Sequence, residues 1–388
     1  MSRFNPIWII LLLLNCALAG CKKSSNQPPG QSKIYYAWNQ FVMGADLSYA
    51  NAVEDNGVVY KDSGNSKDLF TIFKNHGANL VRVRLWYDPN WQAPYNNGKI
   101  YSDLADATKT IQRAKNAGLV VLLDLHYSDT WADPGKQATP SAWSGLGLNL
   151  LKDSVYNYTL RVLNYFKSKN LVPEFIQVGN EINNGMLWPA GQVVNNNWIS
   201  FAGLLNMGIK AIRDFAATSA IKPQIILHVA QLQNADWWAG NITSNGVNDF
   251  DILGLSHYYI WSTINSMAQV SGIIASLKSK YNKKIMIVET AYPWTAQNAD
   301  AYPNIISGSS GFDGYAVTKD EQYRFLKDIT QQVISGGGSG VIYWEPAWIS
   351  SSYKDQWGTG SPWENNAFFD FNGNLLPAID FMTNDYKF

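Results

Sequence analysis

Two glutamates lie at the ends of apolar stretches, and their placement suits acid–base chemistry. Glu181 closes 174–181, "EFIQVGNE", and Glu289 lies in 284–292, "KIMIVETAY". Two facing carboxyls match glycoside hydrolysis, in which one protonates the leaving oxygen and the other attacks or stabilises the anomeric carbon. A separation of about 5 to 5.5 Å would mean retention of configuration. The alternative, that one or both are salt-bridged structural acids, stays open at this point.

Other side chains near the same ends suit the handling of a sugar. Arg84 is the expected partner of Glu289, because a neighbouring cation keeps a nucleophilic carboxylate ionised. Asn180 is expected to hydrogen-bond the sugar 2-hydroxyl at the transition state. Indole rings offer flat surfaces on which sugar rings stack, and Trp344 is the first candidate. The other candidates of this kind are Trp86, Trp131 and Trp294.

Eight short apolar runs alternate with segments of helical period, which predicts a parallel sheet with crossover helices. The strand candidates are 41–46, 79–86, 119–127, 174–181, 224–230, 250–259, 284–292 and 340–348. Helical periodicity is clearest in 67–77, 103–118, 151–169, 198–216 and 318–334. Eight repeats predict a single (β/α)₈ TIM barrel, an α/β fold in which the carboxyl ends of the strands surround the active site.

Six motifs resemble the arabinogalactan endo-β-1,4-galactanases of glycoside hydrolase family 53. They are "GADLSY", "LVRVRLWYDP", "VLLDLHYSDTWADPGKQ", "IQVGNEINNGMLWP", "IVETAYPWT" and "YWEPAW", and the resemblance runs from about Gly44 to Asp370. The chain departs from the family at His257-Tyr258-Tyr259, where the family usually has Tyr-Tyr-Pro. Only Tyr258 is retained there, and His257 is as well explained by a structural role as by substrate contact.

The resemblance implies an endo-acting, retaining hydrolase of β-1,4-linked galactan, as in type I arabinogalactan of plant pectin. It makes Glu181 the general acid/base and Glu289 the nucleophile, with a polysaccharide as partner and no cofactor for catalysis. The counterparts of the clan's typical companion residues are Arg84, His126, Asn180, Tyr258 and Trp344, and the expected substrate-binding residues also include Trp86, Asp129, Trp131 and Trp294. The long segments 127–145 and 348–366 are expected to form the walls of a cleft.

Some members of that family hold a structural calcium ion between the seventh and eighth loops. The corresponding oxygen donors here are Asn298, Asp300, the carbonyl of Tyr302, Asn304, Ser361 and Glu364. Alternating oxygen ligands suit the flexible shell of calcium. The chain has fewer carboxylates than the family pattern, and a polar loop that binds no metal explains the same residues equally well.

The N-terminus is read as a targeting segment. An apolar run precedes Leu18-Ala19-Gly20-Cys21, which resembles a bacterial lipobox, so residues 1–20 are expected to be a lipoprotein signal peptide and Cys21 the lipidated residue. Residues 21–36 read as a flexible tether and 37–388 as the hydrolase domain. We therefore expect a monomer attached by lipid to a bacterial outer membrane, on its periplasmic face or the cell surface. A plain signal peptide with an incidental cysteine is the alternative.

Composition limits the other functions. Lys plus Arg and Asp plus Glu each number 30, so no broad positive field attracts nucleic acid. A metal-dependent hydrolase built on His126 and His228 is disfavoured, because only four histidines are present and none forms a closely spaced pair. The remaining alternatives are a related endoglycanase acting on mannan or β-glucan, and a glycan-binding lipoprotein that has lost catalysis.

Overall fold

A computed structural model describes residues 33–388, of which Ile34–Phe388 form one compact unit. The unit begins three residues earlier than the expected start at 37, because Ile34 donates its backbone N–H to Thr383 and the Tyr36 hydroxyl donates to the carbonyl of Asn384. The predicted signal peptide and Cys21 lie outside the described residues. Within the described part, no helix combines the length and apolar character needed to cross a bilayer.

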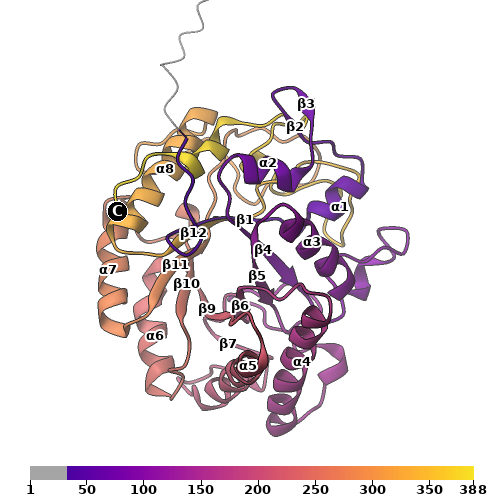
Figure 1. The fold of residues 1–388 in the computed structure, drawn as a ribbon, viewed down its shortest axis with the longest axis vertical. Coiled ribbons are helices and arrows are strands. Elements are labelled where there is room, and N and C mark those ends of the chain that lie inside the picture. The colour runs from indigo at the N-terminus through magenta and orange to yellow at the C-terminus, as the bar shows by residue number, and fades with distance from the viewer. Residues whose placement is uncertain (1–32) are drawn as a thin grey trace, which may run out of the picture. The chain divides into compact units, whose positions relative to one another are not determined.

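Eight parallel strands close into a barrel, as the alternating pattern predicts (Figure 1). They are β1 (Val42–Asp46), β4 (Leu80–Leu85), β5 (Val120–Leu125), β6 (Phe175–Val178), β9 (Gln224–Ala230), β10 (Ile252–Ser256), β11 (Lys284–Glu289) and β12 (Gly340–Tyr343). Their order around the barrel is β1-β12-β11-β10-β9-β6-β5-β4. All eight strand candidates are confirmed, and six of the observed strands end earlier than expected, where the chain turns into the loops of the site, whereas β1 and β9 end as expected.

Helices form a ring around the strands (Figure 1). They are α1 (Ala50–Asp55), α2 (Leu69–Asn75), α3 (Leu104–Asn116), α4 (Leu148–Ser168), α5 (Ile199–Thr218), α6 (Ala235–Ser244), α7 (Gln269–Tyr281) and α8 (Lys319–Ser335). Three begin at side chains that cap the first turn: Asp68, Asp103 and Thr318 each accept a backbone N–H. Such caps satisfy N–H groups that have no partner inside the helix.

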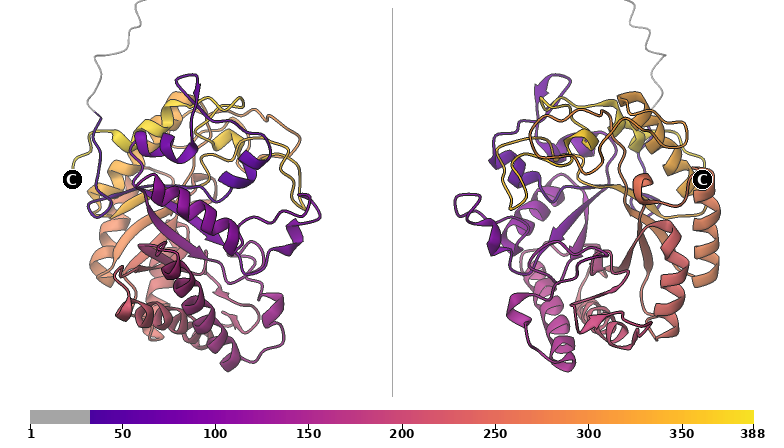
Figure 2. Two further views of the ribbon diagram at one scale, coloured as in Figure 1. Left: turned by 45° about the vertical axis from the view of Figure 1, so that its right-hand side comes forward. Right: turned by 180° about the vertical axis from the view of Figure 1, so that it is seen from behind.

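Short elements complete the unit. Two small hairpins pair β2 (Lys61–Asp62) with β3 (Asn65–Ser66) and β7 (Gly185–Met186) with β8 (Gly191–Gln192). The 3₁₀ turns are η1 (Asn90–Gln92), η2 (Ser141–Trp143), η3 (Leu232–Asn234), η4 (Tyr259–Trp261), η5 (Glu364–Asn366) and η6 (Pro377–Thr383). The C-terminal segment, yellow in Figure 2, returns to the first hairpin, where Leu375 donates its N–H to the carbonyl of Lys61.

The barrel interior changes from apolar to polar toward the carboxyl ends of the strands. A separate apolar cluster with members from all eight strands consists of Val42, Leu80, Leu122, Phe175, Ile226, Ile252, Met286, Val288 and Ile342. Two residues further along, the same sides of three strands carry Arg82, Asp124 and Gln177, all buried. Because side chains alternate along a strand, this layer lies directly above the apolar one and forms the floor of the site.

A bulge between β10 and β11 turns Glu289 into the barrel mouth. Leu255 pairs with Ile287, but the next pair is Ser256 with Glu289, so the register skips Val288. Val288 belongs to the interior cluster, and strict alternation would turn the following residue outward. The bulge therefore re-aims the Glu289 side chain, as bulges beside active sites often do.

Candidate active site

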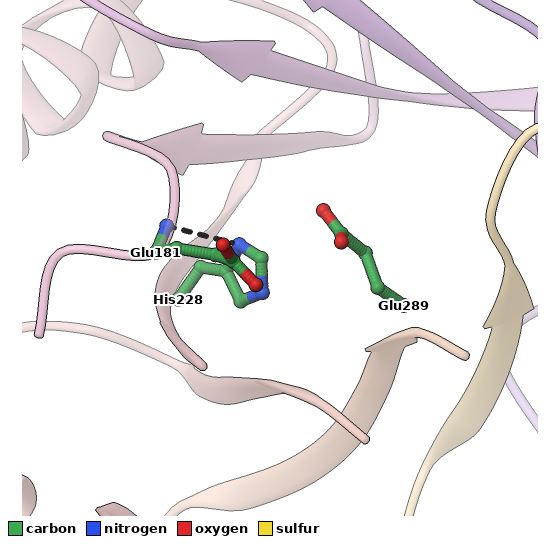
Figure 3. Close-up of side chains that lie close together, drawn as sticks. All are labelled: Glu181, His228 and Glu289. Carbon is green, nitrogen blue, oxygen red and sulfur yellow. Dashed lines mark hydrogen bonds between the residues drawn. The ribbon is translucent and has the colours of Figure 1, made fainter. Parts of the chain in front are cut away.

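Glu181 enters the mouth through a strained turn at the end of β6. Gly179 has φ +79°, and a Cβ there would lie 2.6 Å from Ile182 Cγ2, so the turn requires glycine. Glu181 itself has φ +46°, a conformation that is uncommon for a residue with a side chain. Figure 3 shows Glu181 with His228 on one side of the site and Glu289 facing them from the other. One carboxylate oxygen of Glu181 lies within 4.8 Å of one of Glu289.

Glu289 is buried and held by a cation and a phenol. Arg82 Nη1 lies 2.7 Å from Oε1, and the Tyr258 hydroxyl donates to Oε2 at 2.9 Å. The expected partner Arg84 is therefore wrong: its Nη1 lies 3.4 Å from Glu345 instead. Both arginines project from β4 two residues apart, and Arg82 is the one that reaches Glu289.

Arg82 is fixed in turn by buried acceptors on its neighbours. Its Nη1 also contacts Asp46 at 2.9 Å, while Nη2 donates to Asp124 at 2.9 Å and to the Asn180 amide oxygen at 2.8 Å. Residues from β1, β5 and the end of β6 thus orient one guanidinium toward the nucleophile candidate. A rigid planar fork of donors suits this role better than a flexible ammonium group.

Glu181 has a different environment. It is half-buried, and its Oε1 accepts a 2.6 Å hydrogen bond from the Ser256 hydroxyl, while its backbone N–H points at Nδ1 of His228 at 3.3 Å. Burial, followed by the negative charge of Glu289, raises the pKa of Glu181. A carboxyl with a raised pKa holds its proton near neutral pH, as a general acid requires.

The two carboxyls compete for one proton. Burial also raises the pKa of Glu289, but Arg82 and the hydrogen bond from Tyr258 act against that rise. Glu181 has no ion pair at hydrogen-bonding distance among the described residues, so it is the member of the pair that keeps the proton. This division assigns the acid to Glu181 and the carboxylate to Glu289.

Glu181, His228 and Glu289 bring three potential ligand atoms together, but the His228 nitrogens and the Glu289 oxygens already have partners. His228 Nε2 lies 2.8 Å from the Ser256 hydroxyl, and its Nδ1 faces the Glu181 N–H. Both oxygens of Glu289 are bonded, as described above. Hydrogen bonds and the Arg82 ion pair account for the positions of these side chains.

Three expected sugar contacts lie beneath the site. Arg84 is sandwiched among aromatic rings, with its guanidinium carbon 4.2 Å from the Trp131 ring centroid. Trp86 is fully buried and donates to His126 Nδ1 at 3.2 Å, and His126 Nε2 lies 3.0 Å from Asp124. All three side chains contact the Trp131 ring and are absent from the cleft lining, and their direct contact with substrate stays a prediction.

Two further residues expected to bind substrate, Asp129 and Trp294, are absent from the cleft lining. Asp129 accepts the backbone N–H groups of Asp88 and Ser141, so its carboxylate organises a loop. Trp294 is 9% exposed, packs on Phe371 and donates to the carbonyl of Glu364. These hydrogen bonds and ring contacts hold both side chains outside the residues that line the cleft.

His257, whose role the sequence left open, is buried and absent from the cleft lining. Its backbone N–H donates to the carbonyl of Glu289, and burial lowers its pKa to about 4. The ring is therefore neutral, and the residue ties the end of β10 to the end of β11. This position favours the structural interpretation.

A cleft of about 710 Å³ lies above the two glutamates. Four expected residues line it: Trp131, Asn180, Tyr258 and Trp344. The expected wall segments also contribute, and further lining residues that the sequence did not single out are Asp133, Asn183, Gln231, Trp261, Trp348, Asp355, Trp357 and Trp363. The rings of Trp261 and Trp357 are about half exposed, which leaves aromatic faces available to a sugar.

The expected metal loop contains two buried oxygens without a hydrogen-bond partner, Asn304 Oδ1 and Glu364 Oε2. Asn298 lies beside them, because its oxygen accepts from Asn304 Nδ2 at 2.6 Å. Burial raises the pKa of Glu364 to about 7. Two other expected donors already have partners: the Ser361 hydroxyl donates to the Trp348 carbonyl and accepts the Trp363 N–H, and the Asp300 oxygens accept the N–H groups of Tyr302 and Ser361.

Comparison with known proteins agrees with this geometry. The sequence profile of glycosyl hydrolase family 53 matches residues 42–382. An arabinogalactan endo-β-1,4-galactanase of Cellvibrio japonicus (strain Ueda107) is 44% identical over 352 residues, covering 89% of this chain and 92% of that protein. An endo-β-1,4-galactanase of Bacillus subtilis (strain 168) is 32% identical, covering 87% and 84%.

A solved structure extends the comparison to the fold. The family 53 catalytic domain of Ignisphaera aggregans superposes with a TM-score of 0.81 at 34% identity, covering 92% of this chain and all of that one. The family match over most of the chain, the relatives matched over most of their length and the shared barrel all agree. The chain belongs to glycosyl hydrolase family 53.

Proposed function

We propose that this chain is an endo-β-1,4-galactanase that hydrolyses the galactan of type I arabinogalactan with retention of configuration. The observation that carries the proposal is the pair Glu181 and Glu289, whose carboxylate oxygens approach within 4.8 Å. This spacing agrees with the retaining arrangement of about 5 to 5.5 Å better than with the inverting range of about 6.5 to 9.5 Å. The names of the relatives supply the expected substrate.

In the first step, Glu289 attacks the anomeric carbon while Glu181 protonates the departing glycosidic oxygen. The C–O bond to the leaving sugar breaks as a glycosyl–carboxylate bond forms. Arg82 keeps the attacking oxygen ionised, and the Tyr258 hydroxyl holds the other carboxylate oxygen. Asn180 lines the cleft and is oriented by Arg82, and we expect it to hydrogen-bond the sugar 2-hydroxyl.

In the second step, Glu181 acts as a base. It removes a proton from water, the water oxygen attacks the anomeric carbon, and the bond to Glu289 breaks. Both inversions together return the original configuration. Since Glu181 is protonated when the cycle starts and ionised midway, its pKa must fall as the charge of Glu289 is consumed in the covalent bond.

The substrate is tested by incubating the purified protein with linear β-1,4-galactan, mannan and cellulose. We expect short galacto-oligosaccharides early in the reaction, which is the pattern of attack within a polymer. Activity confined to mannan would overturn the substrate, and release of single galactose units alone would overturn the endo mode. Anomeric NMR signals of the first product report retention or inversion directly.

We also propose a structural calcium ion at Asn298, Asn304 and Glu364, with Asp300 and the Tyr302 carbonyl completing an oxygen shell. The two unpartnered buried oxygens of Asn304 and Glu364 fit a hard cation. When bound, the ion supplies positive charge to a buried carboxylate and joins the loop after β11 to the loop after β12. It takes no part in hydrolysis, because two carboxyls suffice.

Calcium removal tests this proposal. Chelation is expected to lower the melting temperature by a few degrees, on the order of what a ligand well above its Kd contributes, and added calcium should restore it. Glu364→Gln should abolish the calcium-dependent shift, whereas Asp153→Asn, on the exposed side of α4, should keep it. An unchanged melting temperature with and without calcium would refute the site.

Finally, we propose that Cys21 carries a lipid that anchors a monomer to the outer membrane. One chain supplies both carboxyls and their partners, so a monomer is sufficient for catalysis. Cells fed labelled palmitate should label the protein, and Cys21→Ser should release it from the membrane fraction. Membrane retention of that variant would contradict the anchor, and light scattering of the detergent-solubilised protein reports the number of chains.

A further inference from the structure

Ser256 is a buried serine at the end of β10 that the two-carboxylate mechanism does not use. It is fully buried, and its hydroxyl donates to Glu181 Oε1 at 2.6 Å. The Ser256 hydroxyl oxygen also lies 2.8 Å from Nε2 of His228, which is fully buried on β9. The two side chains link the proposed acid/base to two neighbouring strands of the barrel wall.

The partners of His228 fix the direction of these hydrogen bonds. Two N–H groups face Nδ1, from the Gln177 amide at 3.1 Å and from the Glu181 backbone at 3.3 Å. Nδ1 is therefore assigned as the acceptor, so the ring proton is on Nε2. In this tautomer the ring makes no hydrogen bond to Asn180 Oδ1, which lies 3.0 Å from Nδ1 and is already bonded to Arg82.

The assignment of Nε2–H decides what the serine does. The ring donates to the Ser256 oxygen, so the one serine proton is directed at Glu181 Oε1. Among the described residues, no side chain hydrogen-bonds Oε2, and Glu181 is partly exposed and lines the cleft. One oxygen of Glu181 is thus occupied by a donor, and the other is left for proton transfer.

We propose that Ser256, held by neutral His228, is a positioning residue that reserves Oε2 of Glu181 for the proton delivered to the glycosidic oxygen. The same hydrogen bond stabilises the ionised carboxylate that activates water in the second step. This inference rests on the proposed role of Glu181 as acid/base. It assigns to β9 and β10 the task that Arg82 and Tyr258 perform for Glu289.

The charges around Glu181 come from several elements and set the background for a test by pH. Glu289 on β11 and Asp133 in the loop after β5 raise its pKa, Arg82 on β4 lowers it, and the Ser256 hydrogen bond also lowers it. Burial keeps His228 neutral, with its pKa well below the usual value. Loss of the serine hydroxyl therefore removes one of the groups that favour the ionised form.

The test compares Ser256→Ala, Ser256→Thr and Thr290→Val in pH profiles of kcat/KM on galactan. Ser256→Ala should lose roughly 10- to 100-fold in activity, as for a hydrogen bond to a charged group, and its basic limb should move to higher pH. Ser256→Thr retains a hydroxyl and should restore the limb. Thr290→Val removes a nearby buried hydroxyl that donates to the His257 carbonyl, and it should leave the limb in place.

A folded Ser256→Ala enzyme with an unmoved limb and activity within about twofold of the parent would overturn the proposal. If that variant does not fold, nitrogen NMR of the parent protein decides: the proposal requires His228 to carry its proton on Nε2, and a proton on Nδ1 overturns it. Glu181→Gln in the same assay separates a failure of the Ser256 proposal from a failure of the acid/base role of Glu181. Full activity of that variant would refute the acid/base role itself, independently of Ser256.

Discussion

The two halves of the site treat chemically identical side chains in opposite ways. Glu289 lies in a charged half, where Arg82 contacts one oxygen and Tyr258 the other. Glu181 lies in a neutral half, where its carboxyl meets a hydroxyl that is itself held by an uncharged imidazole. A cation stabilises a carboxylate strongly, whereas a neutral donor stabilises it weakly and permits protonation.

The different neighbours of the two glutamates explain how one barrel gives them different roles. Both are removed from bulk water, which raises both pKa values, and the neighbours then decide which carboxyl ionises first. The charged half also has many fixed acceptors around Arg82, so the nucleophile candidate is rigidly held. The neutral half keeps one carboxylate oxygen open to the cleft, as proton transfer requires.

Glu289→Ala should cause the largest loss of activity of the substitutions considered. Without the nucleophile, hydrolysis of galactan should fall on the order of 10⁴-fold or more, as when other covalent catalytic groups are removed. Azide should restore turnover of an aryl galactobioside with a good leaving group, because the small anion fits the vacated space. The product should be the α-azide, and near-normal activity without azide would contradict the assignment.

Glu181→Gln should have the next largest effect and a different signature. Galactan hydrolysis should fall roughly 10²- to 10⁴-fold, the usual worth of a general acid. An aryl galactobioside whose leaving group needs no proton should lose less in the first step, so a burst of released phenol should precede slow turnover. Equal losses on both substrates would show that the residue does not protonate the leaving group.

Comparing Arg82→Lys with Arg84→Lys tests which arginine keeps Glu289 ionised. Lysine keeps the charge but not the fork of donors, so the pKa of Glu289 should rise in Arg82→Lys. Because Glu289 must be ionised to react, the acidic limb of kcat/KM should move to higher pH, with a rate loss on the order of 10²-fold. Arg84→Lys should reduce stability while leaving that limb in place. A shift in Arg84→Lys alone would restore the partner expected from the sequence.

The sequence predicted the barrel and the glutamate pair because both depend on patterns that are local in the chain. Each strand is an apolar run of the right length, and each ends where a polar residue begins. Strands at fourth and seventh position place their ends across the barrel mouth. The family resemblance added the roles of Glu181 and Glu289, and the sequence match over residues 42–382 confirmed the family.

The partner of Glu289 was not predictable in the same way. Arg82 and Arg84 lie on the same side of β4, and only the stagger of the strands and the bulge at Ser256 decide which one reaches the glutamate. Two of the four expected tryptophans do not line the cleft, for a related reason. Trp86 and Trp294 follow the same strand-end pattern as Trp344, but loop packing buries the first two, and no local signal distinguishes them.

Covalent trapping tests the central claim, the division of roles between Glu181 and Glu289, most directly. An activated 2-deoxy-2-fluoro-β-galactobioside should glycosylate the enzyme in the first step as its leaving group departs, and the glycosyl-enzyme should accumulate because the fluorine slows the second step. Peptide mapping by mass spectrometry then identifies the modified residue. The account predicts a single label on Glu289, and a label on Glu181 or on any other carboxylate would contradict it.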